Sequence, residues 1–106
     1  MSGSTFDPAV NAGLLKVPGG SRREVAQAAG ISNRQVSKSL RWATEVAQRN
    51  ARAEEEITKV ERQNPGQDVD PYEICRVVGL RSVRSLYYLD AWMRYQARRK
   101  CEARSK

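Results

Sequence analysis

The sequence predicts a small all-α protein in which a long helix joins two similar pairs of helices. Two stretches, SRREVAQAAGI from Ser21 and DPYEICRVVGL from Asp70, share a cap residue, a glutamate three positions later and a glycine six positions after that. This pattern is typical of a capped helix that ends at a glycine in the left-handed conformation. In addition, residues 33–63 contain neither glycine nor proline. One uninterrupted helix is therefore expected between the two pairs.

The first of three expected segments, residues 1–20, contains a short helix. Asp7 is placed to cap this helix, and Pro8 fits its first position, where no backbone N–H is needed. The sequence Pro18-Gly19-Gly20 then ends it.

The second segment, residues 21–63, begins with a helix that Ser21 and Glu24 are expected to cap reciprocally and that ends at Gly30. The long helix follows and runs to Gln63. Small, apolar or amide side chains recur along it at heptad spacing, at Ser39, Ala43, Val46, Asn50, Ala53, Ile57 and Val60. Such a seam has two interpretations: pairing with a second copy of the chain, or packing on other helices of the same chain.

The third segment, residues 64–106, repeats the first helix pair. Asp70 is the expected cap, Gly79 ends the first helix, and the second helix is expected from about residue 82 to residue 99. The two stretches align with an offset of 49 residues up to Leu80 and of 50 beyond it. An internal repeat is the favoured interpretation, and chance convergence is the alternative.

Composition and charge narrow the possible functions. The chain has 106 residues, a formal net charge of +7 and no histidine. Because histidine is the usual general base and the commonest metal ligand, we expect no enzyme activity, no metal and no cofactor. No apolar stretch approaches the ~20 residues of a membrane span, and no signal-peptide core follows Met1. A cytoplasmic, nucleoid-associated protein is therefore expected, without a membrane partner or a small-molecule ligand.

Positive charge is concentrated on the two helix pairs. Residues 21–50 carry a net +4 and residues 71–106 a net +6, whereas residues 51–70 between them carry −3. A basic surface of this kind favours an anionic partner such as nucleic acid.

The stretch from Arg22 to Arg41 resembles the helix-turn-helix of prokaryotic DNA-binding transcriptional regulators. It has the small residue, the turn glycine and the apolar residues of that motif, at Val25, Ala26, Ala29, Gly30, Ile31 and Val36. It departs from the motif at Ser39, where a further apolar residue is usual. The resemblance implies that the second helix of the pair lies in the major groove of double-stranded DNA.

Two sets of side chains follow from this resemblance as candidate DNA contacts. The outward residues expected to read bases are Ser32, Asn33, Arg34, Gln35, Ser37 and Lys38. The residues expected to contact phosphate are Arg22, Arg23, Arg41, Arg81 and Arg84.

The second helix pair is more apolar at the corresponding positions. It offers a set of residues that we interpret as a dimer interface or as core, namely Leu86, Tyr87, Leu89, Trp92 and Met93. The alternative is a second unit that also reads DNA, with Arg81 and Arg84 at the start of its second helix.

The sequence therefore predicts a sequence-specific double-stranded-DNA-binding protein, a repressor that binds its operator as a homodimer through the major groove. One alternative is an accessory protein of plasmid or phage DNA, in partition, relaxosome function or packaging. The other is a helical protein-interaction module, for which DNA affinity would be weak and driven only by charge.

Overall fold

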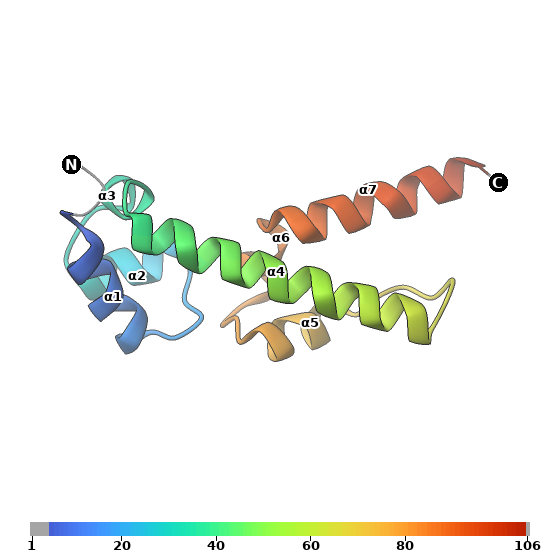
Figure 1. Ribbon diagram of the computed structural model, residues 1–106, viewed down its shortest axis with the longest axis horizontal. Helices are drawn as coiled ribbons and strands as arrows, with labels where there is room; N and C mark the ends of the chain where they lie inside the picture. The colour runs from blue at the N-terminus through green and yellow to red at the C-terminus, as the bar shows by residue number, and fades with distance from the viewer. Residues whose placement is uncertain (1–4, 106) are drawn as a thin grey trace.

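A computed structural model describes residues 5–105, which form seven helices and no strand (Figure 1). The all-α prediction is confirmed. None of these helices is long and apolar enough to span a membrane. In chain order the helices are α1 Asp7–Lys16, α2 Arg22–Ala29, α3 Asn33–Ser37, α4 Leu40–Gln63, α5 Pro71–Val78, α6 Val83–Tyr87 and α7 Asp90–Ser105.

The helix ends that the sequence marks most strongly are confirmed. The Glu24 N–H donates to Ser21 Oγ (3.2 Å), and the Ser21 N–H donates to Glu24 Oε1 (3.0 Å), which completes the capping box at the start of α2. Gly30 ends α2 with φ +73°, and Gly79 ends α5 with φ +87°. Both glycines adopt the left-handed conformation, which side chains with a Cβ rarely adopt.

The prediction of one uninterrupted helix over residues 33–63 is wrong, because the helix is interrupted at Lys38 and Ser39, between α3 and α4. Ser39 is almost fully buried and has an extended backbone; it accepts a hydrogen bond from the Trp42 N–H (3.3 Å) as the cap of α4. The same break recurs at Tyr88 and Leu89, between α6 and α7. Each repeat is therefore a helix, a glycine turn, a five-residue helix, a break and a longer helix.

Asp7 does not cap its own helix, which contradicts the expectation for the first segment. Its carboxylate instead accepts hydrogen bonds from the Ser39 hydroxyl (2.7 Å) and the Arg41 N–H (3.2 Å), so it caps the start of α4. The bond from Ser39 is the main cause that lowers the pKa of Asp7 below its ordinary value of 3.8, although desolvation opposes this. Asn50 of α4 caps the start of α7 in the same way, because its Oδ1 accepts a hydrogen bond from the Ala91 N–H (2.7 Å).

The repeat is larger than the sequence indicates, because it includes the helix before each pair. Asp7 and Asn50, the two capping residues, lie 43 positions apart, and so do the buried residues Leu14 and Ile57. The second half of α4 thus takes the place of α1. We call α1, α2, α3 and the first half of α4 the first unit, and the rest of α4 with α5, α6 and α7 the second unit.

Each unit has its own core. The core of the first unit consists of Val10, Leu14, Val25, Ala26 and Val36. The core of the second consists of Ala53, Ile57, Val69, Ile74, Cys75, Val78, Leu86, Leu89, Ala91, Trp92 and Tyr95. The boundary predicted between residues 63 and 64 therefore separates residues that share a core. The heptad seam of α4 packs largely inside the chain, since Val46, Ala53, Ile57 and Val60 all belong to or contact the second core.

We predict that Asn50→Ala destabilises the protein by about 0.5–2 kcal/mol, the usual cost of removing a helix cap. The Ala91 N–H at the start of α7 would lose its acceptor. Chemical denaturation measures the change in the free energy of unfolding. Gln48→Ala, at an exposed position of the same helix, is the control and should change it by less than about 0.5 kcal/mol. Equal effects of the two substitutions would contradict the capping role.

We predict that Asp7→Asn lowers the melting temperature at neutral pH and that this difference shrinks in acid. Because folding lowers the pKa of Asp7, the ionised carboxylate stabilises the fold above its ordinary pKa, and this stability is lost as the pH falls through the lowered value. Circular dichroism melts of both proteins from about pH 7 to pH 2 measure the difference. A difference that does not depend on pH would contradict the role of the charge.

Candidate nucleic-acid interface

The short helix α3 is the centre of the candidate interface, and its first turn is fixed by its own side chains. The Gln35 N–H donates to Ser32 Oγ (3.2 Å), and the Ser32 N–H donates to Gln35 Oε1 (2.9 Å). The side-chain oxygens of two predicted base readers are thus engaged in a capping box. Ser32 and Gln35 therefore position α3 through these oxygens, whereas their part in reading bases stays a prediction.

Ser37 also works within the chain. Its hydroxyl donates to the Asn33 carbonyl oxygen (3.1 Å) and accepts from Arg22 Nη1 (2.8 Å). This second bond connects the start of α2 to the end of α3, in addition to the packing of Val25, Ala26 and Val36 in the core. Ser37 is therefore a positioning residue here, although the sequence predicts it to read bases.

Three of the predicted base readers present exposed side chains without such a role: Asn33, Arg34 and Lys38. Arg34 and Lys38 are four residues apart in the chain, one on the first turn of α3 and the other at its C-cap. The chain between Glu24 and Glu45 contains no acidic residue. The exposed side chains of α3 and its C-cap are therefore polar or positively charged.

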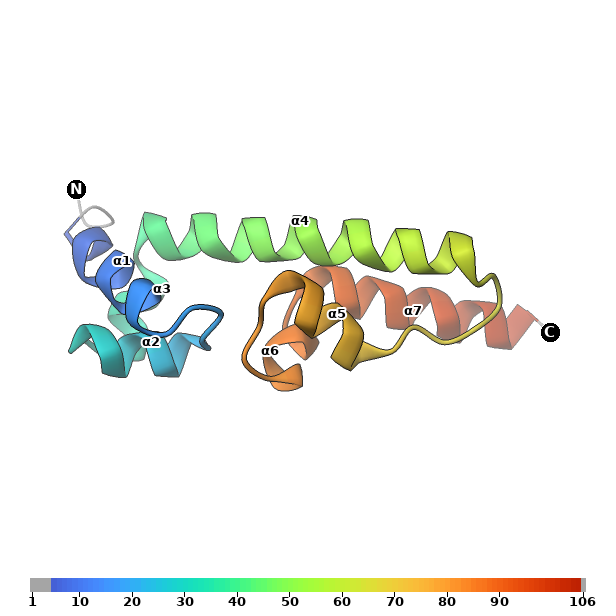
Figure 2. The same cartoon turned by 90° about the horizontal axis from the view of Figure 1, so that it is seen from below.

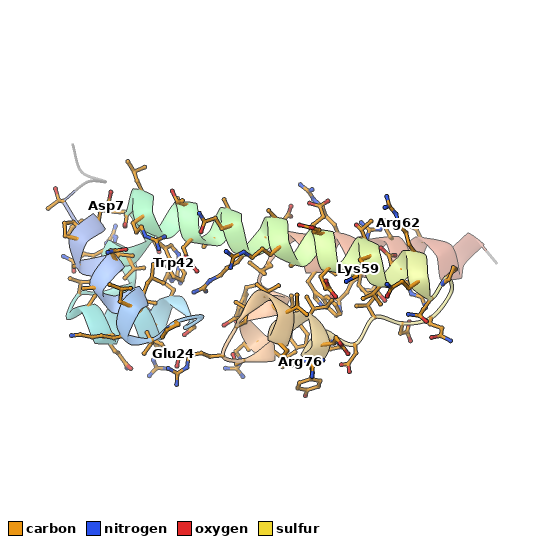
Figure 3. The ribbon with its side chains drawn as sticks, turned by 60° about the horizontal axis from the view of Figure 1, so that its bottom comes forward. Asp7, Glu24, Trp42, Lys59, Arg62 and Arg76 are labelled. Atoms are coloured by element: carbon orange, nitrogen blue, oxygen red, sulfur yellow. The ribbon has the colours of Figure 1, made fainter. Side chains whose placement is uncertain are left out.

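The five predicted phosphate contacts divide into two groups. Arg22, Arg23 and Arg84 are exposed. Arg41 is held by Asn11 Oδ1 (3.1 Å) and Glu45 (3.3 Å). Arg81 pairs with Glu24 across the two units (3.3 Å). Arg41 and Arg81 thus have partners within the chain, as Arg22 has in Ser37, and Arg81 is exposed nevertheless. Their role as phosphate contacts stays a prediction. Figure 3 labels Glu24 on the lower edge of the first unit.

The predicted dimer interface is corrected for three of its five residues. Leu86, Leu89 and Trp92 are 0%, 6% and 4% exposed and belong to the core of the second unit. They pack within their own chain, so they offer no surface to a partner. Tyr87 and Met93 are about half exposed and stay a predicted contact surface, next to Tyr88 at 76%.

Arg49 is an important residue that the sequence analysis misses. It is buried; its Nε pairs with Glu45 (2.9 Å), its Nη1 donates to the Gly20 carbonyl oxygen (2.8 Å), and its guanidinium lies over the Trp42 ring at 5.2 Å. Trp42 lies beneath the start of α4 in Figure 3. The Glu45–Arg49 spacing of four residues signals the ion pair. The bond to Gly20, 29 residues away, has no local signal.

Comparisons with known proteins give no independent indication of function. Neither protein families, nor curated proteins, nor solved structures gave a match to this chain. The function is therefore inferred from the residues and the geometry of the chain itself.

Proposed function

We propose that this protein binds double-stranded DNA in a sequence-specific manner and that α3 enters the major groove. The observation that carries the proposal is the exposed set Asn33, Arg34 and Lys38 on a short helix whose orientation is fixed by its cap and by the Arg22–Ser37 bond. A fixed helix matters because base readout requires donors at defined positions in the groove. Mobile basic side chains alone give only non-specific affinity.

Each exposed residue has a role that follows from its chemistry. Arg34 is suited to a bidentate bond with the O6 and N7 of guanine, and Asn33 to one with adenine. Lys38, at the C-cap of α3, and Arg23, on the first turn of α2, are suited to phosphate oxygens on either side of the groove. The partial positive charge at the N-terminus of α2 adds to this attraction.

A protein of this kind represses transcription by occupying a promoter. We propose this role because a protein bound at a promoter excludes other proteins from the same DNA. A homodimer is one arrangement on DNA, with Tyr87 and Met93 in the contact. The position of bound sites in genomic DNA separates a repressor, at promoters, from an accessory protein of partition or packaging, at arrays near an origin.

We predict that Arg34→Ala weakens binding to the preferred sequence by about 1–3 kcal/mol and relaxes the preference at one base pair. Lys38→Ala should instead weaken binding to preferred and random duplexes by the same factor, because phosphates are present in every sequence. Fluorescence anisotropy with a duplex enriched from a random library, and with a scrambled duplex of equal length, measures both effects.

Arg62→Ala is the control for the loss of one positive charge. Arg62 is exposed near the end of α4 that is far from the first unit (Figure 3). It should change both affinities only slightly. Equal losses on the two duplexes for Arg34→Ala would overturn its role as a base reader. Weak binding that vanishes at physiological salt for every sequence would favour the protein-interaction module.

A further inference from the structure

We infer that one chain contacts a single DNA duplex with both units, so that α6 binds a second segment of the duplex beside the segment bound by α3. The inference rests on the proposed function and adds the second contact surface. Its partner is the same double-stranded DNA. Three features support this: the equivalence of the two short helices, the lack of acidic residues in their segments, and the contacts that join the two units.

The two short helices occupy equivalent places in their units. Both have five residues, follow a glycine in the left-handed conformation, and are separated by two non-helical residues from the longer helix that comes next. Each buries one central side chain completely, Val36 in α3 and Leu86 in α6. In Figure 2, α2 and α3 of the first unit and α5 and α6 of the second all lie on the same side of α4. The two pairs thus follow one another along the same helix.

The segment that contains α6 resembles the segment that contains α3 in its lack of acidic residues. No acidic residue occurs between Glu73 and Asp90, just as none occurs between Glu24 and Glu45. Arg84 occupies the position of Arg34, 50 residues earlier, and is exposed. Guanidinium groups bind guanine or phosphate in this position.

Tyrosines replace polar residues at two further positions of α6. Tyr87 and Tyr88 stand where the first unit has Ser37 and Lys38, and both are exposed. Tyrosine hydroxyls donate to phosphate oxygens. The face thus keeps donors for the DNA backbone while it offers fewer groups that read bases. We expect α6 to add affinity and to fix the orientation of the chain more than it adds sequence preference.

Direct contacts join the two units, so binding of one unit to a duplex brings the other unit close to the same duplex. The Arg81 N–H donates to the Gly19 carbonyl oxygen (3.0 Å), and its guanidinium pairs with Glu24 (3.3 Å). Arg81 is the one extra residue of the second turn, at the point where the repeat offset changes from 49 to 50. The insertion that interrupts the alignment is thus the residue that joins the units.

The joint also depends on close approach of two glycines. Gly19 has φ +73°, and a Cβ on it would overlap the carbonyl oxygen of Gly79. Any larger residue at position 19 pushes the units apart.

Hydroxyl-radical footprinting on the enriched duplex tests the inference, together with sedimentation of the complex. We expect two adjacent protected segments of unequal strength, with one chain per duplex. The double variant Arg84→Ala/Tyr88→Ala should lose protection of the second segment only and bind the full site at least tenfold more weakly. Its affinity for a duplex truncated to the first segment should equal that of the unmodified protein.

A glycine pair provides the matched control for the joint. Gly19→Ala should also lose affinity for the full site, whereas Gly66→Ala should not. Gly66 has a similar φ of +83°, yet a Cβ there would meet nothing within 4 Å. The two variants share the backbone strain and differ only in the clash between units. If Gly19→Ala does not fold, as judged by circular dichroism, the double variant still decides the question.

Three outcomes separate the possibilities. One protected segment, unaffected by Arg84→Ala/Tyr88→Ala, would overturn the inference and leave the proposed function intact. Two equal, symmetric segments with two chains per duplex would overturn it in favour of the homodimer. No sequence preference in the unmodified protein would overturn the proposed function itself.

Discussion

The fold depends on how the helices that follow each chain break obtain acceptors for their first N–H groups. In both units a side chain from the first helix of the unit supplies one acceptor. Asp7 of α1 accepts for α4, and Asn50 of α4 accepts for α7. Without such an acceptor, buried N–H groups at a helix start would be costly. The break is what keeps α3 and α6 short and separate from the long helices that follow. The caps of α4 and α7 therefore allow α3 and α6 to end as separate short helices at the surface.

The sharing of α4 gives the chain its elongated shape and its stiffness. The first half of α4 completes one core and the second half begins another, so the two units cannot turn freely about a linker. Arg49 strengthens this arrangement from the middle of the helix, because it holds the α1–α2 loop through Gly20. A rigid body of this kind presents its basic surface in one orientation. That property suits recognition of a regular polymer such as DNA, whose phosphates repeat at fixed spacing.

Local signals in the sequence predict the helix pairs well, whereas long-range contacts decide the rest. The capping box of Ser21 and the glycine turns at Gly30 and Gly79 involve neighbouring residues, so the pattern alone locates them. The break at Ser39 has no glycine or proline to mark it, and its partner Asp7 is 32 residues away. The surroundings of apolar residues are equally hard to predict. The apolar pattern indicates that Leu86 and Trp92 are buried, but it does not show whether the core of the chain or a partner covers them. In the candidate interface, the residue types predict the polar face of α3 but not that Ser32, Gln35 and Ser37 are engaged within the chain.

The central claim is that α3 gives this protein a preferred DNA sequence, and selection from a random duplex library at physiological salt tests it most directly. We expect enrichment of a defined sequence whose strongest positions contain guanine, because Arg34 is the exposed side chain of α3 best suited to a bidentate base contact. A library that shows no enrichment after several rounds, with binding that depends only on salt, would contradict it.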